Sequence, residues 1–121
     1  MIKGIIVKCD GTVETKEFSQ PLFKSVGVIV DGNIERVNPR GLPKGFIFFY
    51  NEEFIGLNLS PNFIGSILYQ NPESYIGGDI VIFKEAHTSG GIDCVDMTII
   101  EQQNIIKILD EIKIQIKETR I

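Results

Sequence analysis

The residues best suited to covalent chemistry gather near position 90. His87 is the only histidine of the chain, and Asp93 and Cys94 follow it within seven residues. A thiol, an imidazole and a carboxylate are the parts of a cysteine nucleophile with its base and orienting group. The chain lacks a nucleophile-bearing turn signature, however. We therefore interpret His87 as an exposed loop residue and Cys94 as a small apolar residue, and keep a Cys94/His87 hydrolase as a third hypothesis.

Metal and phosphate motifs are missing from the sequence. Cys9, Cys94 and His87 form no C-x-x-C or H-x-x-x-H pair, so we expect no zinc site and no cofactor. Gly77-Gly78 and Gly90-Gly91 could let backbone N–H groups approach an anion. Neither pair belongs to a GxGxxG or GxxxxGK motif, and turn formation alone accounts for both.

The aromatic and asparagine-rich middle of the chain is more suggestive of a ligand site. Tyr69 and Tyr75 bracket a polar turn, and a base that stacks on an exposed ring gains about 1–3 kcal/mol. Carboxamides can bind base or ribose edges, and Arg36 and Arg40 supply the nearest positive charges. The alternative is that the rings form the core and the asparagines form turns. The candidate ligand-binding residues are Arg36, Asn51, Asn58, Asn62, Tyr69 and Tyr75.

Composition and charge exclude several classes of protein. The chain has 121 residues, 43% hydrophobic and 23% charged, which suits a single domain over residues 1–121. A net charge of −4 disfavours binding to a nucleic-acid duplex, which requires a basic stripe. Two cysteines are too few for a disulfide framework, so we expect a reducing cytoplasm. We expect no signal peptide, because residues 1–8 have no long apolar core and no small-residue cleavage site. We expect no membrane association, because no later run reaches the roughly 18 apolar residues of a span.

The first third of the chain predicts a hairpin and a short helix. Residues 2–8 and 12–18 are rich in β-branched residues, and Asp10-Gly11 between them favours a tight turn. Ser19-Gln20-Pro21 is expected to begin a short helix that runs to about Val28. A turn then leads into a short strand over residues 34–37.

Residues 45–62 organise the middle of the chain. The apolar run 46–50 predicts a buried strand, and Asn51-Glu52-Glu53 predicts a tight turn. Residues 54–59 are expected to form the second strand of this central hairpin. Ser60-Pro61 then favours a helix start, with Pro61 as the first residue of a helix that ends near position 69.

The last third predicts a strand, a loop and a long helix. We expect a strand over residues 80–84 and a glycine-containing loop over 85–93. Thr98 and Glu101 form a capping box that opens a helix to about Thr119. Its main apolar stripe comprises Ile105, Ile108, Leu109, Ile112 and Ile116.

The same helix has more isoleucines than one stripe needs. At roughly 100° per residue, Ile99, Ile106 and Ile114 fall on another side, with Ile100 near its margin. Either the helix is sandwiched inside its own domain, or the second stripe packs against another subunit. We favour a homo-oligomer. The predicted fold is α+β: a mixed or antiparallel sheet of about five or six strands, a short central helix, and a long C-terminal helix packed on one face.

Four short motifs follow one another along most of the chain. They are Val30-Asp31-Gly32-Asn33-Ile34-Glu35-Arg36-Val37, Asn51-Glu52-Glu53, Gly56-Leu57-Asn58-Leu59 with Asn62, and Ile76-Gly77-Gly78-Asp79-Ile80-Val81-Ile82. From about residue 2 to 110, their order and spacing resemble a family of small domains of unknown function carried by bacteriophages and mobile elements. Asp31 stands where that family usually has a glycine, and Asn58 where it usually has a proline.

This resemblance implies a counter-defence role in the cytoplasm of a host cell, because phages keep small non-enzymatic domains that blunt host immunity. The first hypothesis is a non-catalytic oligomer that sequesters a nucleotide immune signal at a subunit boundary. Its role would be similar to that of the phage sponges that block Thoeris defence, with a cyclic ADP-ribose isomer as one such signal. The alternative is an inhibitor that docks on a host defence protein, such as a CRISPR nuclease or a restriction enzyme.

Overall fold

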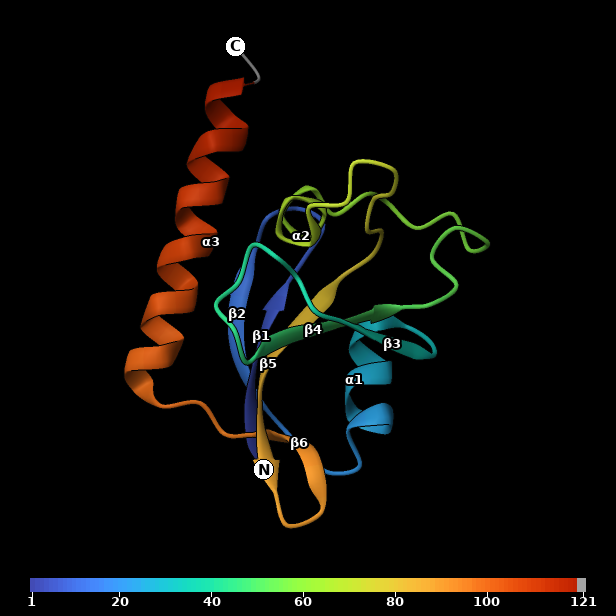
Figure 1. Cartoon of the computed structure of the whole chain (residues 1–121). Coiled ribbons are helices and arrows are strands. Elements are labelled where there is room, and N and C mark those ends of the chain that lie inside the picture. Colours follow the sequence, from blue (N-terminus) through green and yellow to red (C-terminus); the bar gives the residue numbers. More distant parts are fainter. Residues whose placement is uncertain (120–121) are drawn as a thin grey trace.

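The computed structural model describes residues 1–119 and has an α+β fold, as predicted (Figure 1). A six-stranded antiparallel sheet has the strand order β2-β1-β5-β4-β3, and β6 pairs with the distal half of β5. The strands are β1 (Ile2–Val7), β2 (Val13–Phe18), β3 (Ile34–Val37), β4 (Phe46–Asn51), β5 (Ile80–Thr88) and β6 (Gly91–Val95). The helices are α1 (Leu22–Val30), α2 (Phe63–Tyr69) and α3 (Ile99–Thr119).

The centre of the sheet is β5, which is buried on both faces over its first four residues. Its neighbours are β1 on one side and β4 on the other. Because side chains alternate across a strand, Ile80 and Ile82 enter one core while Val81 and Phe83 enter the other. A continuous apolar run is what a strand covered on both faces requires.

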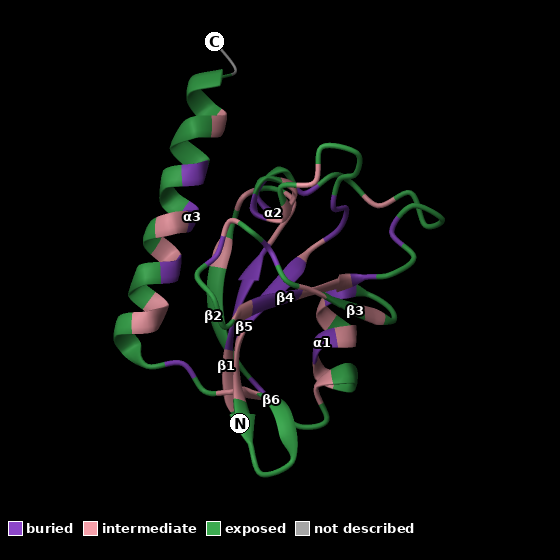
Figure 2. Cartoon of the chain, viewed as in Figure 1, coloured by how far each residue is buried: buried purple, intermediate pink, exposed green. Residues whose placement is uncertain are grey.

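Helices cover the two faces of the sheet unequally. On one face, α3 contributes Ile105, Leu109 and Ile112 to a core that also includes residues of α2. On the other face, α1 contributes Val26 and Val30. The buried side of α3 faces the sheet, and its other side is exposed (Figure 2). The predicted packing of the long helix on one face is therefore confirmed, and α1 closes the opposite face.

Two local predictions in the first half of the chain are confirmed. The hairpin of β1 and β2 forms around Asp10 and Gly11, whose φ of 90° is the positive value that glycine tolerates. The short helix α1 begins after Pro21 and ends two residues beyond the predicted position 28, where Asp31 adopts a left-handed conformation with φ of 62°.

The predicted second strand of the central hairpin is wrong. Residues 54–58 form consecutive turns, and β4 pairs instead with β3 and β5. The side-chain oxygen of Asn51 accepts a hydrogen bond from the Glu53 N–H at 2.8 Å, which turns the chain at the end of β4. Phe54 is buried between the rings of Tyr50 and Tyr75, whereas Ile55 is 69% exposed. This segment is apolar, but it has no neighbouring strand to pair with.

The predicted loop over residues 85–93 is also wrong. The strand β5 continues to Thr88, and a tight turn leads into β6, with Glu85 paired to Cys94. Gly91 has φ of 113°, so the glycines serve this hairpin turn. The turn residues were recognised in the sequence, but the polar strands that flank them were not.

The starts of α2 and α3 show two capping arrangements. Asn62, not Ser60, caps α2, and its side-chain oxygen accepts a hydrogen bond from the Gly65 N–H at 2.9 Å; Pro61 lies outside the helix. The capping box of α3 is confirmed, because the Thr98 N–H donates to Glu101 and the Glu101 N–H donates to the Thr98 hydroxyl. Within residues 1–119, no helix has the length and apolar character needed to cross a membrane.

Candidate functional site

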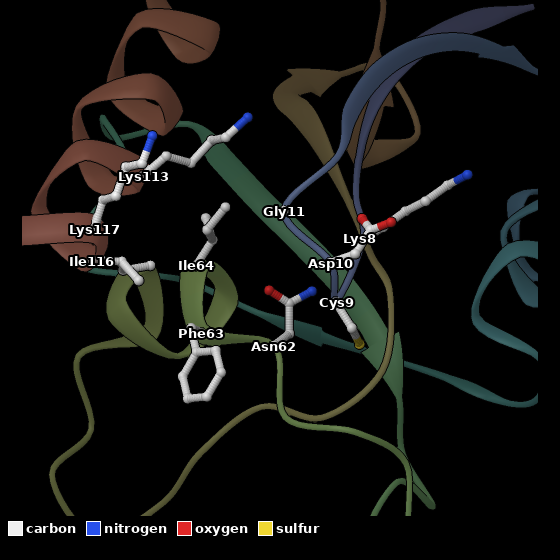
Figure 3. Close-up of a pocket in the computed structure, with 10 residues that line it drawn as sticks. All are labelled: Lys8, Cys9, Asp10, Gly11, Asn62, Phe63, Ile64, Lys113, Ile116 and Lys117. Carbon is white, nitrogen blue, oxygen red and sulfur yellow. The ribbon is translucent and has the colours of Figure 1, made fainter. Parts of the chain in front are cut away.

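A cleft of about 430 Å³ opens between the C-terminal half of α3, the start of α2 and the turn that joins β1 to β2 (Figure 3). Its volume lies within the range of small-molecule sites in proteins. Its lining combines three lysines, one carboxylate and apolar side chains: Lys8, Cys9, Asp10, Gly11, Asn62, Phe63, Ile64, Lys113, Ile116 and Lys117.

Helix α3 supplies the positive wall of the cleft. Lys113 and Lys117 are one turn apart and exposed, and neither forms an ion pair or a side-chain hydrogen bond with any residue from 1 to 119. Figure 3 shows the Lys113 side chain extended across the gap toward the turn between β1 and β2. Ile116 on α3 and Ile64 on α2 form an apolar floor beside these ammonium groups.

The opposite wall carries one positive charge, on Lys8, and two negative charges, on Asp10 and on Glu14 beside it. The Lys8 ammonium lies 3.9 Å from the Glu14 carboxylate and points away from α3 (Figure 3). Hydrogen bonds from Thr12 lower the pKa of Asp10 below its ordinary 3.8, so this carboxylate is ionised at neutral pH. The uncompensated positive charge of the cleft therefore lies on α3.

The base of the cleft is held together by hydrogen bonds inside the protein. The Asn62 amide donates to the Val7 carbonyl at 2.9 Å and to the Gly78 carbonyl at 3.0 Å. The Cys9 thiol donates to the Ser60 carbonyl at 3.3 Å. Burial, together with the nearby Asp79 carboxylate, raises the pKa of Cys9 above 9.0. Cys9 is thus a protonated thiol at neutral pH, and the cleft offers no thiolate nucleophile.

Two of the six predicted ligand-binding residues have structural partners instead. Asn51 is fully buried, and its amide donates to the carbonyls of Val30 and Asp31, both at 3.1 Å. It thereby ties the C-terminus of α1 to the end of β4. Asn62 lines the cleft, but each polar atom of its side chain already has a partner in the protein. We assign both carboxamides a positioning role.

The structure does not bring the other four together. Arg36 donates from Nε to Glu85 at 2.6 Å and also bonds that carboxylate through Nη2. Tyr69 lines a separate hollow of about 270 Å³ with Arg40. Tyr75 packs edge-on against Phe54 with 5.2 Å between ring centroids, and Asn58 occupies an exposed left-handed turn.

None of the three lysines that line the cleft was among the predicted ligand-binding residues. One signal was present: Lys113 and Lys117 are four residues apart and flank Ile116, which belongs to the core stripe of α3. Such lysines border the buried face of a helix. Their apposition to residues 8–11 depends on long-range packing, which no local pattern contains.

The hydrolase hypothesis concerns β5 and β6, where His87 and Cys94 lie on neighbouring strands. Burial is the main cause that raises the pKa of Cys94 to about 11, and the Glu85 carboxylate adds to it. No hydrogen bond joins His87 to Cys94 in the part of the chain that the structure describes. The same residues, 1–119, contain no group of three or more His, Cys, Asp or Glu side chains that could hold a metal ion.

A pKa of about 11 predicts slow chemistry at Cys94. In a Cys9→Ser variant, alkylation of Cys94 by iodoacetamide should be slower at pH 7 than alkylation of an unhindered thiol with a pKa of 9.0. Its rate should keep rising up to about pH 11, because the thiolate is the reactive form. Mass spectrometry of the modified protein measures the rate. A rate that levels off near pH 7 would reveal an activated thiolate and revive the hydrolase hypothesis.

Comparisons with known proteins do not assign the chain to a family. No family model matches the sequence, no curated protein matches it, and no solved structure matches the fold. The resemblance to the phage-borne domains stays a prediction, and the function has to be argued from the cleft.

Proposed function

We propose that the protein is a non-catalytic binding protein that captures a small nucleotide-type anion in the cleft beside α3. The observation that carries this proposal is the pair of ammonium groups of Lys113 and Lys117, which have no ion-pair partner within residues 1–119 and lie next to the apolar side chains Ile64 and Ile116. A ligand that suits both parts carries phosphate at one end and a flat apolar ring at the other. A nucleotide has this composition.

The shape of the cleft supports such a ligand. Phe63 lies at the far end of the cleft from the two α3 lysines, and its side chain is half exposed (Figure 3). A base placed near this ring would leave its phosphates on the lysine side, and stacking on an aromatic face contributes about 1–3 kcal/mol. The whole chain has a net charge of −4, so attraction of an anion to this site is local.

The chemistry of the cleft favours capture over turnover. Its thiol has a raised pKa and its carboxylate has a lowered pKa, so neither is near the neutral value that suits a general base. In the setting that the phage resemblance implies, the captured anion would be a nucleotide immune signal, such as a cyclic ADP-ribose isomer. Sequestration of that signal would be a counter-defence function.

Isothermal titration calorimetry tests the proposal with cyclic ADP-ribose isomers, cyclic dinucleotides and phosphate-free adenosine as probes. We expect at least one phosphate-bearing probe to bind and adenosine to bind far more weakly. A Lys113→Ala/Lys117→Ala variant should raise the dissociation constant at least tenfold, or about 1.4 kcal/mol. A matched Lys24→Ala/Lys44→Ala variant removes two exposed lysines elsewhere and should leave binding unchanged.

Two results would contradict this proposal. If no probe binds below millimolar concentration, the cleft is not a nucleotide site, and the inhibitor of a host defence protein becomes the better hypothesis. If the Lys113→Ala/Lys117→Ala variant binds as tightly as the unmodified protein, the ligand binds elsewhere.

A further inference from the structure

The loop that follows β4 presents two neighbouring apolar side chains to solvent. Ile55 is 69% exposed and Leu57 is 52% exposed. Figure 1 shows residues 52–58, which we call the 52–58 loop, projecting from the molecule on the side remote from α3. Apolar side chains that gather on a projecting surface typically mark a contact with a partner.

Backbone hydrogen bonds fix the shape of this loop. The Leu57 N–H donates to the Glu53 carbonyl at 2.9 Å, and the Asn58 N–H donates to the Ile55 carbonyl at 3.1 Å. The buried ring of Phe54 anchors the loop to the body of the protein. A loop that is ordered before binding loses little conformational entropy when a partner covers it.

The loop is acidic as well as apolar. Glu52 and Glu53 are exposed, and neither forms an ion pair in the described part of the chain, residues 1–119. The sequence has no lysine, arginine or histidine from residue 45 to residue 83. A surface that is complementary to the loop is therefore apolar, with positive charge beside it. The carboxylates would repel the same loop of another copy, and they would also repel an anionic membrane.

The cleft beside α3 has the complementary composition. Lys113 and Lys117 are exposed, have no ion-pair partner among residues 1–119, and lie next to Ile64 and Ile116. The cleft volume of about 430 Å³ is larger than a single aliphatic side chain needs. The two carboxylates and two aliphatic side chains of the loop thus match two ammonium groups and two isoleucines of the cleft.

We infer that the 52–58 loop of one copy of the chain docks in the cleft beside α3 of a second copy. The apolar tip of the loop lies against the isoleucines of the cleft, and its carboxylates face the two lysines. Because the loop and α3 lie on different sides of one chain (Figure 1), the contact is head-to-tail, and each pair keeps one free loop and one free cleft. The loop is smaller than a standard interface of about 800 Å² per partner, so the association is weak and depends on concentration.

The inference uses the cleft but does not depend on its proposed ligand. A nucleotide would compete with the loop, because both need Lys113 and Lys117. Self-association is therefore measured without nucleotide. A chain that binds no nucleotide can still associate, and a chain that stays monomeric can still bind a nucleotide, so the two proposals fail in distinguishable ways.

Sedimentation velocity over a dilution series tests the contact. The sedimentation coefficient of the unmodified chain should rise with protein concentration, and added salt should weaken the association because it screens the charges. An Ile55→Ser/Leu57→Ser variant removes the apolar tip of the loop, and a Lys113→Ala/Lys117→Ala variant removes the charges of the cleft. Each variant should raise the dissociation constant at least tenfold.

The matched control is an Ile99→Ser/Ile100→Ser variant. It removes two apolar side chains that are 70% and 69% exposed at the start of α3. This variant should associate as the unmodified chain does. Loss of association in this variant alone would place the interface on the outer face of α3 and overturn the inference.

An equimolar mixture of the loop variant and the cleft variant tests the head-to-tail geometry. Each variant keeps one intact half of the contact, so the mixture should form a 1:1 pair and no larger species. Circular dichroism confirms that every variant keeps its fold. A chain that is monomeric at all concentrations, a loop variant that still associates, or a mixture that stays monomeric would overturn the inference.

Discussion

Asn62→Asp should lower the free energy of unfolding by about 3 kcal/mol or more, although it changes a single side-chain group. Removing the amide deprives the Val7 and Gly78 carbonyls of their donor. The substitution also places a carboxylate oxygen where the amide nitrogen now lies, next to both carbonyl oxygens. Residue 62 is only 1% exposed. An uncompensated buried charge typically costs about 3–5 kcal/mol. Urea denaturation followed by circular dichroism measures the loss.

The loss should depend on pH in a defined direction. Burial and the two carbonyl oxygens disfavour the ionised form, so the folded-state pKa of the new aspartate lies above its unfolded value of about 3.9. An acidic group whose pKa is raised in the folded state costs the least stability below its unfolded-state pKa, because it is then protonated in both states. The deficit should therefore grow as the pH rises above about 4.

Asn58→Asp is the matched control for this substitution. Asn58 is exposed in a left-handed turn, which aspartate also tolerates, so its replacement should change stability by less than about 0.5 kcal/mol. If Asn62→Asp is as mild as this control, the hydrogen bonds of Asn62 do not hold α2 against β1.

Phe83→Ala should lower the free energy of unfolding by about 3–5 kcal/mol, the usual range for a buried phenylalanine. Phe83 is fully buried in β5 under α1. Its ring makes edge contacts with Phe18 and Phe49, with centroid distances of 5.2 and 5.8 Å. Phe23→Ala removes the same side chain from the exposed surface of α1, where the ring is 64% exposed, and should have little effect.

Phe83→Leu keeps the prediction measurable if the alanine variant fails to fold, and it allows a test of packing. A Cβ atom at Gly4 would lie 2.8 Å from two ring atoms of Phe83 and 2.9 Å from Val81. Gly4→Ala alone should therefore be destabilising by about 1–3 kcal/mol. In the Phe83→Leu background its effect should be smaller, because part of the clash is removed. Strict additivity of the two changes would show that the ring and Gly4 are not in contact.

Local patterns accounted for those parts of the fold that short-range physics determines. The capping box of Thr98 and Glu101 fixes the start of α3, and the buried isoleucines of that helix recur at helical spacing. Asp10-Gly11 likewise places the first hairpin. In each case, neighbouring residues in the sequence supply both partners of the interaction.

The errors arose where distant residues decide the outcome. Residues 54–59 have strand-like composition, but β3 and β5 already occupy both sides of β4. Asn51 and Asn62 appeared to be ligand-binding carboxamides because the carbonyls that they bond lie 20 or more residues away or on another element. Of the predicted ligand residues only Asn62 lines the cleft, and the α3 lysines opposite it could not be placed without the tertiary structure.

The two walls of the cleft are far apart in the sequence: Lys8 and Lys113 are separated by 105 residues. During translation, residues 8–11 therefore leave the ribosome long before residues 113–117 are synthesised. Until α3 emerges, the inner residues of β1, such as Ile5 and Val7, lack the part of their cover that α3 provides. The proposed anion capture would thus be the last property that the nascent chain acquires, and a chain truncated before α3 would expose more of the apolar sheet face to chaperones.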